Sequence, residues 1–139
     1  MKYKKVLIDT DILSHFLRKN PVVVTHFENY ILEHEKITIS RITVIEILGG
    51  LKAKSASKQL QNFEELIHSF HILDTSEKVA QLASDAFASL YKKGRHSGNF
   101  DVINAAIAME NDLAICTNNV KDYQNIEGLE IVNWLENLI

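Results

Sequence analysis

The sequence predicts an α/β fold: a three-layer α/β/α sandwich around a central, mainly parallel sheet of four to five short strands. Two observations predict it. Short, wholly apolar runs such as residues 6–8 are typical of strands buried on both faces, and helical patterns separate these runs. No repeat or linker interrupts the 139 residues, a length typical of one domain, so we expect a single domain spanning residues 1–139.

Each expected element follows from the spacing of apolar residues, which is helical in some segments and continuous in others. The expected strands are residues 6–8, 37–39, 71–73, 113–116 and 130–132. The expected helices are residues 12–18, 21–35, 41–54, 58–69, 76–93 and 100–111.

Start and stop signals support these helix boundaries. Asn20 is a good N-cap and precedes a proline, which is favoured at the first helical position. Ser40 can cap the helix that follows it, and Thr75 or Ser76 can cap the helix that runs to residue 93. Gly94 then stands where a glycine commonly ends a helix.

Composition excludes several classes of protein. The chain has 15 basic and 18 acidic residues, a formal charge of −3, which argues against a protein that coats nucleic acids non-specifically. The single Cys116 cannot form an internal disulfide, and no apolar run approaches the roughly 20 residues that span a bilayer. We therefore expect a soluble cytoplasmic protein with no membrane partner. An enzyme with carboxylates in its site remains compatible with this charge.

Asp9 is the first candidate functional residue, because it directly follows a buried apolar strand. An ionised group in that position needs a partner or a metal ion. Ligands of parallel α/β folds bind beyond the carboxyl ends of the strands, where Asp9 lies. The nearby Asp11 has a simpler interpretation as the N-cap of a helix beginning at Ile12.

Glu46 is the second candidate, because residues 42–51 are apolar on nearly all sides and predict a buried helix. Glu46 shares a stripe with Ile42, Ile45 and Gly49. A buried carboxylate is protonated, paired or bound to a cation. The alternative is a glutamate that reaches water from the edge of the buried face.

Asp101 is the third candidate. It opens a helix, where the helix dipole stabilises an acidic residue, so capping is one interpretation. Its face continues with the small residues Asn104, Ala105 and Ala108, which predicts a packed junction. If the three candidate carboxylates converge, their mutual repulsion favours a hard divalent cation bound by oxygen ligands.

Four segments carry a resemblance to a known family: residues 7–13, 39–47, 100–106 and 116–123. In this order and at these intervals they resemble the PIN-domain ribonucleases, and most of all the VapC-like toxins of toxin–antitoxin pairs. The resemblance covers essentially the whole chain. It implies a metal-dependent endoribonuclease that uses Mg²⁺ or Mn²⁺ to hydrolyse RNA. It also implies a homodimer that is inhibited by a cognate antitoxin protein.

The resemblance also implies roles for individual residues. By matching position, Asp9, Glu46 and Asp101 form the acidic triad that holds the metal. Asn119 falls where many members have a fourth acidic residue, and Thr117 orients the first carboxylate.

Two positions depart from the family pattern. Asp11 stands where the family usually has asparagine, so it either adds charge near the metal or caps the helix. Asn119 removes one charge and weakens a second metal site.

Two further sets of residues have both a structural and a functional interpretation. The basic residues before Asp101 form either a solvated helix end or a contact with RNA phosphates; they are Lys92, Lys93, Arg95 and His96. Four apolar residues form either core or a dimer face; they are Ile12, Phe16, Phe27 and Ile31.

Two rival functions stay open. Asp9-Thr10-Asp11 after a strand resembles the opening motif of haloacid-dehalogenase-like phosphatases, but no late Asp-Asp pair follows. A PIN-like module that binds RNA or protein without cleavage is the other, and the neutral Asn119 is the feature that favours it.

Overall fold

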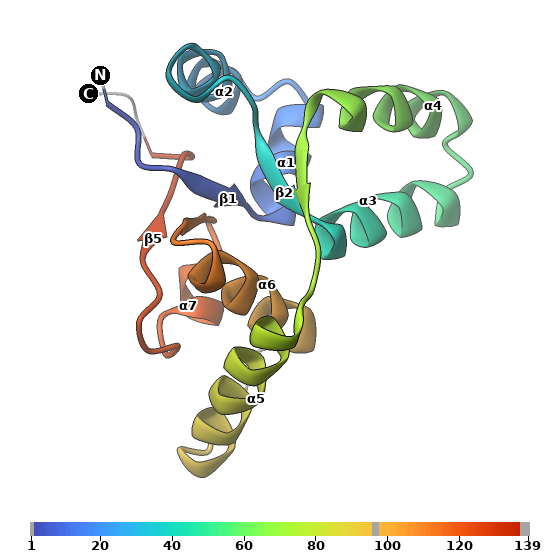
Figure 1. Ribbon diagram of the computed structural model, residues 1–139. Coiled ribbons are helices and arrows are strands. Elements are labelled where there is room, and N and C mark those ends of the chain that lie inside the picture. Colours follow the sequence, from blue (N-terminus) through green and yellow to red (C-terminus); the bar gives the residue numbers. More distant parts are fainter. Residues whose placement is uncertain (1, 96–97, 137–139) are drawn as a thin grey trace.

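The computed structural model describes residues 2–95 and 98–136 (Figure 1). His96 of the basic cluster lies outside this range. The strands are β1 (Val6–Ile8), β2 (Thr38–Ser40), β3 (His71–Leu73), β4 (Ala114–Cys116) and β5 (Ile131–Val132). The helices are α1 (Thr10–Leu17), α2 (Pro21–His34), α3 (Arg41–Ala53), α4 (Ser57–Leu66), η1 (Ile67–Ser69, a 3-10 turn), α5 (Glu77–Lys92), α6 (Asn99–Glu110) and α7 (Val120–Tyr123).

The strands pair in parallel, as expected for the α/β class. They form two sheets rather than one: a three-stranded sheet in the order β1-β4-β5 and a two-stranded sheet of β2 and β3. β2 runs beside β1, so the two sheets lie next to each other (Figure 1). The predicted class and strand direction are confirmed, and the single continuous sheet is the part that differs.

Alternate residues of the central strands face two separate cores. Val6 and Ile8 of β1 pack with residues of α1 and α2, whereas Leu7 packs with residues of α5 and α6. All three side chains are buried. Because successive side chains of a strand point to opposite faces, a wholly apolar strand requires helices on both sides. The result is the three-layer arrangement.

The predicted helix caps are present. The Asn20 side chain accepts hydrogen bonds from two backbone N–H groups at the start of α2. Ser40 and Ser76 accept one each at the starts of α3 and α5. Gly94 has φ +65°, which is the left-handed conformation that glycine adopts without steric cost.

α1 begins at Thr10 rather than Ile12, so the expectation that Asp11 is its N-cap is wrong. The chain passes from strand to helix without a loop. The Asp9 backbone N–H donates to the Cys116 carbonyl at 2.9 Å, and the Asp9 carbonyl accepts from the Leu13 N–H at 3.1 Å. Asp9 therefore extends the β1 pairing and occupies the N-cap position at the same time.

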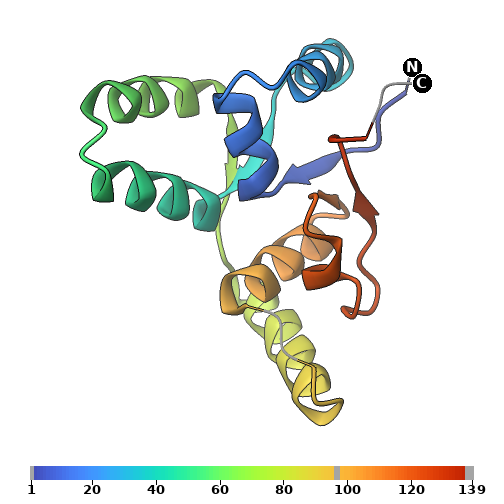
Figure 2. The same cartoon turned by 180° about the vertical axis from the view of Figure 1, so that it is seen from behind.

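α3 is less buried than its apolar sequence predicts. Ile45 is 52% exposed, and Gly49 and Gly50 are also exposed. α3 and α4 extend together away from the sheets, and residues 48–53 of α3 are only partly buried or exposed (Figures 1 and 2). The buried residues of α3 are Ile42, Thr43, Val44 and Ile47.

Three of the four residues that could form either core or a dimer face belong to the core. Ile12 and Phe27 are buried in the core of this chain, and Phe16 stacks on Phe27 with ring centroids 4.1 Å apart. Of the four residues, Ile31 is the exposed one. Among the described residues, no helix is long and apolar enough to cross a membrane.

Candidate functional site

The pairing of β1 with β4 places the first two site residues side by side. Ile8 is in register with Cys116, so Asp9 and Thr117 follow directly at the carboxyl ends of adjacent strands. The Thr117 hydroxyl lies 2.9 Å from Asp9 Oδ2, to which it donates a hydrogen bond. Both residues are buried. Strand register alone therefore brings a hydroxyl donor to the first carboxylate.

The Asp9 carboxylate is only 3% exposed. Burial, reinforced by the nearby charge of Asp11, raises the pKa of Asp9 from 3.8 to about 6. Its hydrogen bonds with Thr117 and Tyr123 act in the opposite direction, because they stabilise the ionised form. The ionised form of Asp9 is therefore poorly solvated, and its hydrogen bonds do not fully offset the cost of burying the charge.

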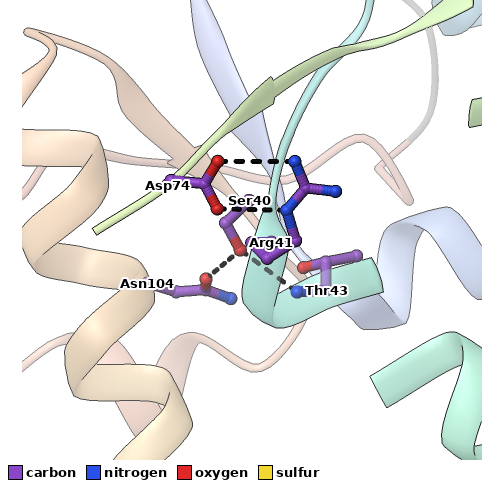
Figure 3. A network of polar contacts seen from close by, with 5 residues as sticks. All are labelled: Ser40, Arg41, Thr43, Asp74 and Asn104. Atoms are coloured by element: carbon purple, nitrogen blue, oxygen red, sulfur yellow. Dashed lines mark hydrogen bonds and ion pairs between the residues drawn. The ribbon is translucent and has the colours of Figure 1, made fainter. Parts of the chain in front are cut away.

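Asn104 is another side-chain donor to Asp9, and its Nδ2 lies 3.3 Å from Asp9 Oδ1. Ser40 sets the orientation of this amide, since its hydroxyl donates to Asn104 Oδ1 (Figure 3). The NH₂ group of Asn104 is thereby left facing Asp9. Ser40 Oγ also accepts from the Thr43 N–H at 3.1 Å, so the N-cap of α3 is part of the same network. A helix start is thereby coupled to the site.

An exposed ion pair supports this helix start. Arg41 Nε lies 3.0 Å from Asp74 Oδ1, which joins the first residue of α3 to the segment after β3 (Figure 3). Exposed pairs of this kind add little stability, but this one links the first residue of α3 to the residue that follows β3, at the carboxyl ends of the two paired strands.

Asp101 lies in the first turn of α6 and contacts the buried Tyr123 of α7. The Tyr123 hydroxyl donates to Asp101 Oδ1 at 3.2 Å. Burial raises the pKa of Asp101, and the charges of Asp122, Glu46 and Asp11 raise it further. The hydrogen bond from Tyr123 opposes this shift. Carboxylates from three other elements therefore act electrostatically on Asp101.

Glu46 is half-buried on α3, and α1 holds it in place. The Thr10 hydroxyl donates to Glu46 Oε1 at 2.7 Å and lies 3.1 Å from Thr43 Oγ1. Thr10 is the first residue of α1, directly after Asp9. The strand-to-helix junction thus positions two of the three predicted triad residues.

Asp11 connects α1 to the segment after β4. Its Oδ2 accepts from the Asn118 N–H at 2.9 Å, and its Oδ1 lies 3.3 Å from the Thr117 hydroxyl. Asn119 is exposed at the start of α7, where its side chain forms no capping bond, and its N–H donates to Thr117 Oγ1 at 3.0 Å. The Thr117 hydroxyl therefore contacts Asp9, Asp11 and the backbone of Asn119.

The predicted basic cluster lies at the end of α5 that points away from the sheets (Figures 1 and 2). Lys93 pairs with Glu127 at 3.1 Å, and Arg95 donates to Asn125 Oδ1 at 2.8 Å. Lys92 is exposed. Two of the three described cations thus bond to the segment after α7, and contact of this cluster with RNA stays a prediction.

Three residues of this site carried no predicted role: Tyr123, Asn104 and Thr10. Tyr123 lies in a four-residue helix that is too short for a periodic pattern. Asn104 stands in the sequence among the small residues of the Asp101 face, but an amide on a buried helix face is itself a signal for a polar partner. Thr10 lies between Asp9 and Asp11, and a threonine at the start of a helix gives no sequence signal for a contact with a distant glutamate.

The site's donors are chemically suited to a hard divalent cation, because they are carboxylate oxygens. In the part of the chain that the structure describes, no Lys or Arg forms an ion pair with Asp9, Asp11, Glu46 or Asp101. Within those same residues, no three acidic, histidine or cysteine side chains converge closely enough to hold an ion by themselves. Mg²⁺ commonly takes one or two carboxylates and completes its shell with water, so the set fits that ion.

Comparison with known proteins identifies the class. The PIN domain family matches residues 6–128, and the chain therefore belongs to the PIN-domain family. The predicted resemblance is confirmed, and the phosphatase alternative is wrong. PIN ribonucleases generally depend on a divalent metal.

Particular relatives are similar over nearly their whole length. The tRNA(fMet)-specific endonuclease VapC of Shigella flexneri is 28% identical over 131 residues, which cover 94% of this chain and 98% of the relative. Ribonuclease VapC1 of Haemophilus influenzae is 24% identical over 129 residues, covering 92% and 96%. The crystal structure of DNA-bound VapBC from Salmonella typhimurium matches with a TM-score of 0.84 and 26% identity, covering 95% of this chain and 99% of that one.

Proposed function

We propose that this PIN-domain protein is an endoribonuclease that hydrolyses RNA phosphodiester bonds with Mg²⁺ or Mn²⁺. The observation that carries the proposal is the buried Asp9, held by Thr117 and Asn104 at the paired strand ends and acted on by the charge of Asp11. The relatives support RNA as the substrate, since they are named ribonuclease and endonuclease.

The same proposal assigns a biological role. The chain is the toxin of a toxin–antitoxin pair and is inhibited by a cognate antitoxin protein. The VapBC structure and the VapC names support this role. A cytoplasmic homodimer is the expected state of such a toxin.

Asp9 and Asp101 are the residues that would hold the ion, directly or through water. A bound divalent ion polarises the phosphate and lowers the pKa of a bound water molecule. Thr117 and Asn104 keep the two Asp9 oxygens oriented for this task.

Glu46 completes the acidic shell. The Thr10 hydroxyl donates to Glu46 Oε1 and fixes the orientation of the carboxylate. The other oxygen, Oε2, would then position or deprotonate the attacking water. In this scheme the protein supplies orientation and a proton acceptor at defined atoms.

The test is cleavage of a mixed RNA pool by wild type and by Asp9→Asn. We expect cleavage with Mn²⁺, none with EDTA, and a loss of about 100-fold or more in the variant, because the first ligand loses its charge. Asp85→Asn is the matched control, since Asp85 is exposed on α5. Metal-independent cleavage, or full activity of Asp9→Asn, would contradict the proposal.

A PIN-like binding module is the second candidate. The neutral, exposed Asn119 favours it, together with the lack of a ready three-residue metal cluster in the described chain. The same assay separates the two functions, because a module binds RNA and never turns it over.

A further inference from the structure

A cavity of about 400 Å³ opens beside the candidate active site, between α1, α3 and α4. Thr10 and Glu46 line it, so it shares two residues with the site already described. Cavities that hold small ligands begin at about 300 Å³, which makes this one large enough for a compact group such as a nucleotide.

The rest of the lining consists of five apolar residues (the apolar floor), two cations (the cationic rim) and four small or uncharged polar residues, which are Ser14, Gly50, Gln59 and Asn62. The apolar residues are Leu17, Ile47, Leu51, Phe63 and Leu66. Arg18 and Lys54 are both exposed and line the same cavity. Neither cation forms an ion pair with an acidic residue within the described chain. Arg18 Nη2 lies 3.4 Å from His15 Nδ1, a contact that leaves its charge in place. The cavity therefore offers apolar surface and positive charge that no acidic partner neutralises, next to a cluster of carboxylates.

We propose that this cavity is an RNA subsite that binds one nucleotide of a single-stranded substrate next to the bond to be cleaved. The apolar floor receives the base, and Arg18 and Lys54 contact the flanking phosphates. This inference deepens the proposed ribonuclease activity and rests on it.

The distribution of charge is the argument for RNA as the occupant. The carboxylates of the site repel phosphates, so a nuclease needs cations beside the acids to bind its substrate. Arg18 and Lys54 supply them at the cavity that Glu46 borders. Contact with the face of a base is tolerant of sequence, so such a subsite accepts any of the four bases.

Two neighbouring glycines of α3 provide a matched test. Gly50 lines the cavity and Gly49 does not, and a Cβ added at either position meets no atom within 4 Å. Both Gly50→Leu and Gly49→Leu should therefore fold, but only the first places a side chain in the cavity.

The measurement is the fluorescence anisotropy of a short, labelled, single-stranded RNA of mixed sequence, in EDTA so that it is not cleaved. We expect Gly50→Leu to raise Kd about tenfold, because one base loses its contact surface. Gly49→Leu should bind as the wild type does. Equal Kd values for the two variants would overturn the subsite, and so would a wild type that does not bind this RNA.

The cationic rim is tested by the salt dependence of the same binding. Each phosphate contact on a single strand contributes about 0.7 to the slope of log Kd against log salt concentration. Lys54→Gln should lower the slope by about that amount. Lys52→Gln is the control. It removes an exposed charge from the last turn of α3, two residues before Lys54, and Lys52 does not line the cavity, so the slope should stay unchanged.

The outcomes separate this inference from the proposed function. Cleavage by wild type with unchanged binding by Gly50→Leu would retain the nuclease and reject the subsite. Cavity-dependent binding without any cleavage in Mn²⁺ would retain the subsite and reject the nuclease. If Gly50→Leu leaves RNA binding intact and instead abolishes inhibition by a protein, the cavity is a protein-docking site and the proposal is wrong.

Discussion

Asp9 is the acidic residue of the site whose pKa is raised to about 6. Its pKa in the folded protein, about 6, lies above the ordinary value of 3.8 because of burial and the charge of Asp11. Between these two values the folded protein binds the proton more tightly than the unfolded chain does. The contribution of Asp9 to stability is therefore complete below pH 3.8 and is lost as the pH rises through about 6.

Asp9→Asn should consequently stabilise the metal-free protein above about pH 6, by on the order of 3 kcal/mol. Asparagine keeps an acceptor for Asn104, and the Thr117 hydroxyl can reverse to accept from its NH₂ group. Urea unfolding in EDTA measures the difference. The advantage should disappear at low pH, where wild-type Asp9 is protonated; an advantage that is absent at every pH would contradict this account.

We predict that Tyr123 positions Asp101. Its ring is fully buried, and its hydroxyl donates to Asp101 Oδ1. Tyr123→Phe removes that donor and keeps the packing. We expect about tenfold weaker Mn²⁺ binding, since residues that orient metal ligands typically contribute 10- to 100-fold in affinity.

Calorimetric titration with Mn²⁺ measures this effect independently of catalysis. Tyr3→Phe is the control, because it also removes a tyrosine hydroxyl that forms a hydrogen bond. The partner of the Tyr3 hydroxyl is His26, and Tyr3 lies on the N-terminal side of β1. Unchanged Mn²⁺ affinity in Tyr123→Phe would show that the hydroxyl serves packing alone.

At the level of elements, the carboxyl ends of β1 and β4 define the site. Three-residue strands have no room for slippage, because a shift by one residue would exchange the side chains that face the two cores. The register of Ile8 with Cys116 then places Asp9 beside Thr117. Site geometry is in this way a consequence of core packing.

The start of α3 combines capping with orientation of a site residue. Ser40 accepts from the Thr43 N–H and donates to Asn104, whereas Ser76 accepts from the Val79 N–H as the cap of α5. Ser40→Ala and Ser76→Ala should each lose about 1 kcal/mol of stability from the lost cap. Only Ser40→Ala should also reduce cleavage, because the Asn104 amide is then free to rotate away from Asp9. Thermal unfolding and RNA cleavage of both variants check this, and equal activities would contradict it.

At the scale of the whole molecule, the net charge of −3 reflects the site. Without Asp9, Glu46 and Asp101, the acidic and basic residues are equal in number. The excess negative charge is therefore concentrated where a cation is expected, and the remaining surface has no bias that would exclude RNA.

Binding of a divalent ion should accordingly stabilise the entire fold. At a free Mn²⁺ concentration 100 times its Kd, binding contributes about 2.7 kcal/mol. We expect Mn²⁺ to raise the Tm of wild type relative to EDTA, and to have little effect on Asp9→Asn. Equal shifts in both proteins would place the ion elsewhere.

Local patterns predicted most elements of this molecule because the interactions that define them are local. The caps Asn20, Ser40 and Ser76 bond to backbone groups two or three residues away, so their spacing in the chain is sufficient evidence. α7 escaped prediction because four residues are too few for a helical period. The burial of α3 was overestimated because apolar residues do not reveal whether a partner covers them, and Ile45 remains exposed.

Residue type and spacing along the chain were sufficient to predict the α/β class, the parallel strands, the family and the candidate acids. The groups that surround those acids follow from the packing of distant segments instead. Asn104 reaches Asp9 across 95 positions, and Thr117 reaches it across 108. Such contacts depend on how two sheets and seven helices pack in the described chain, and no local pattern encodes them. The cavity beside Glu46 belongs to the same level, because three helices must meet to enclose it.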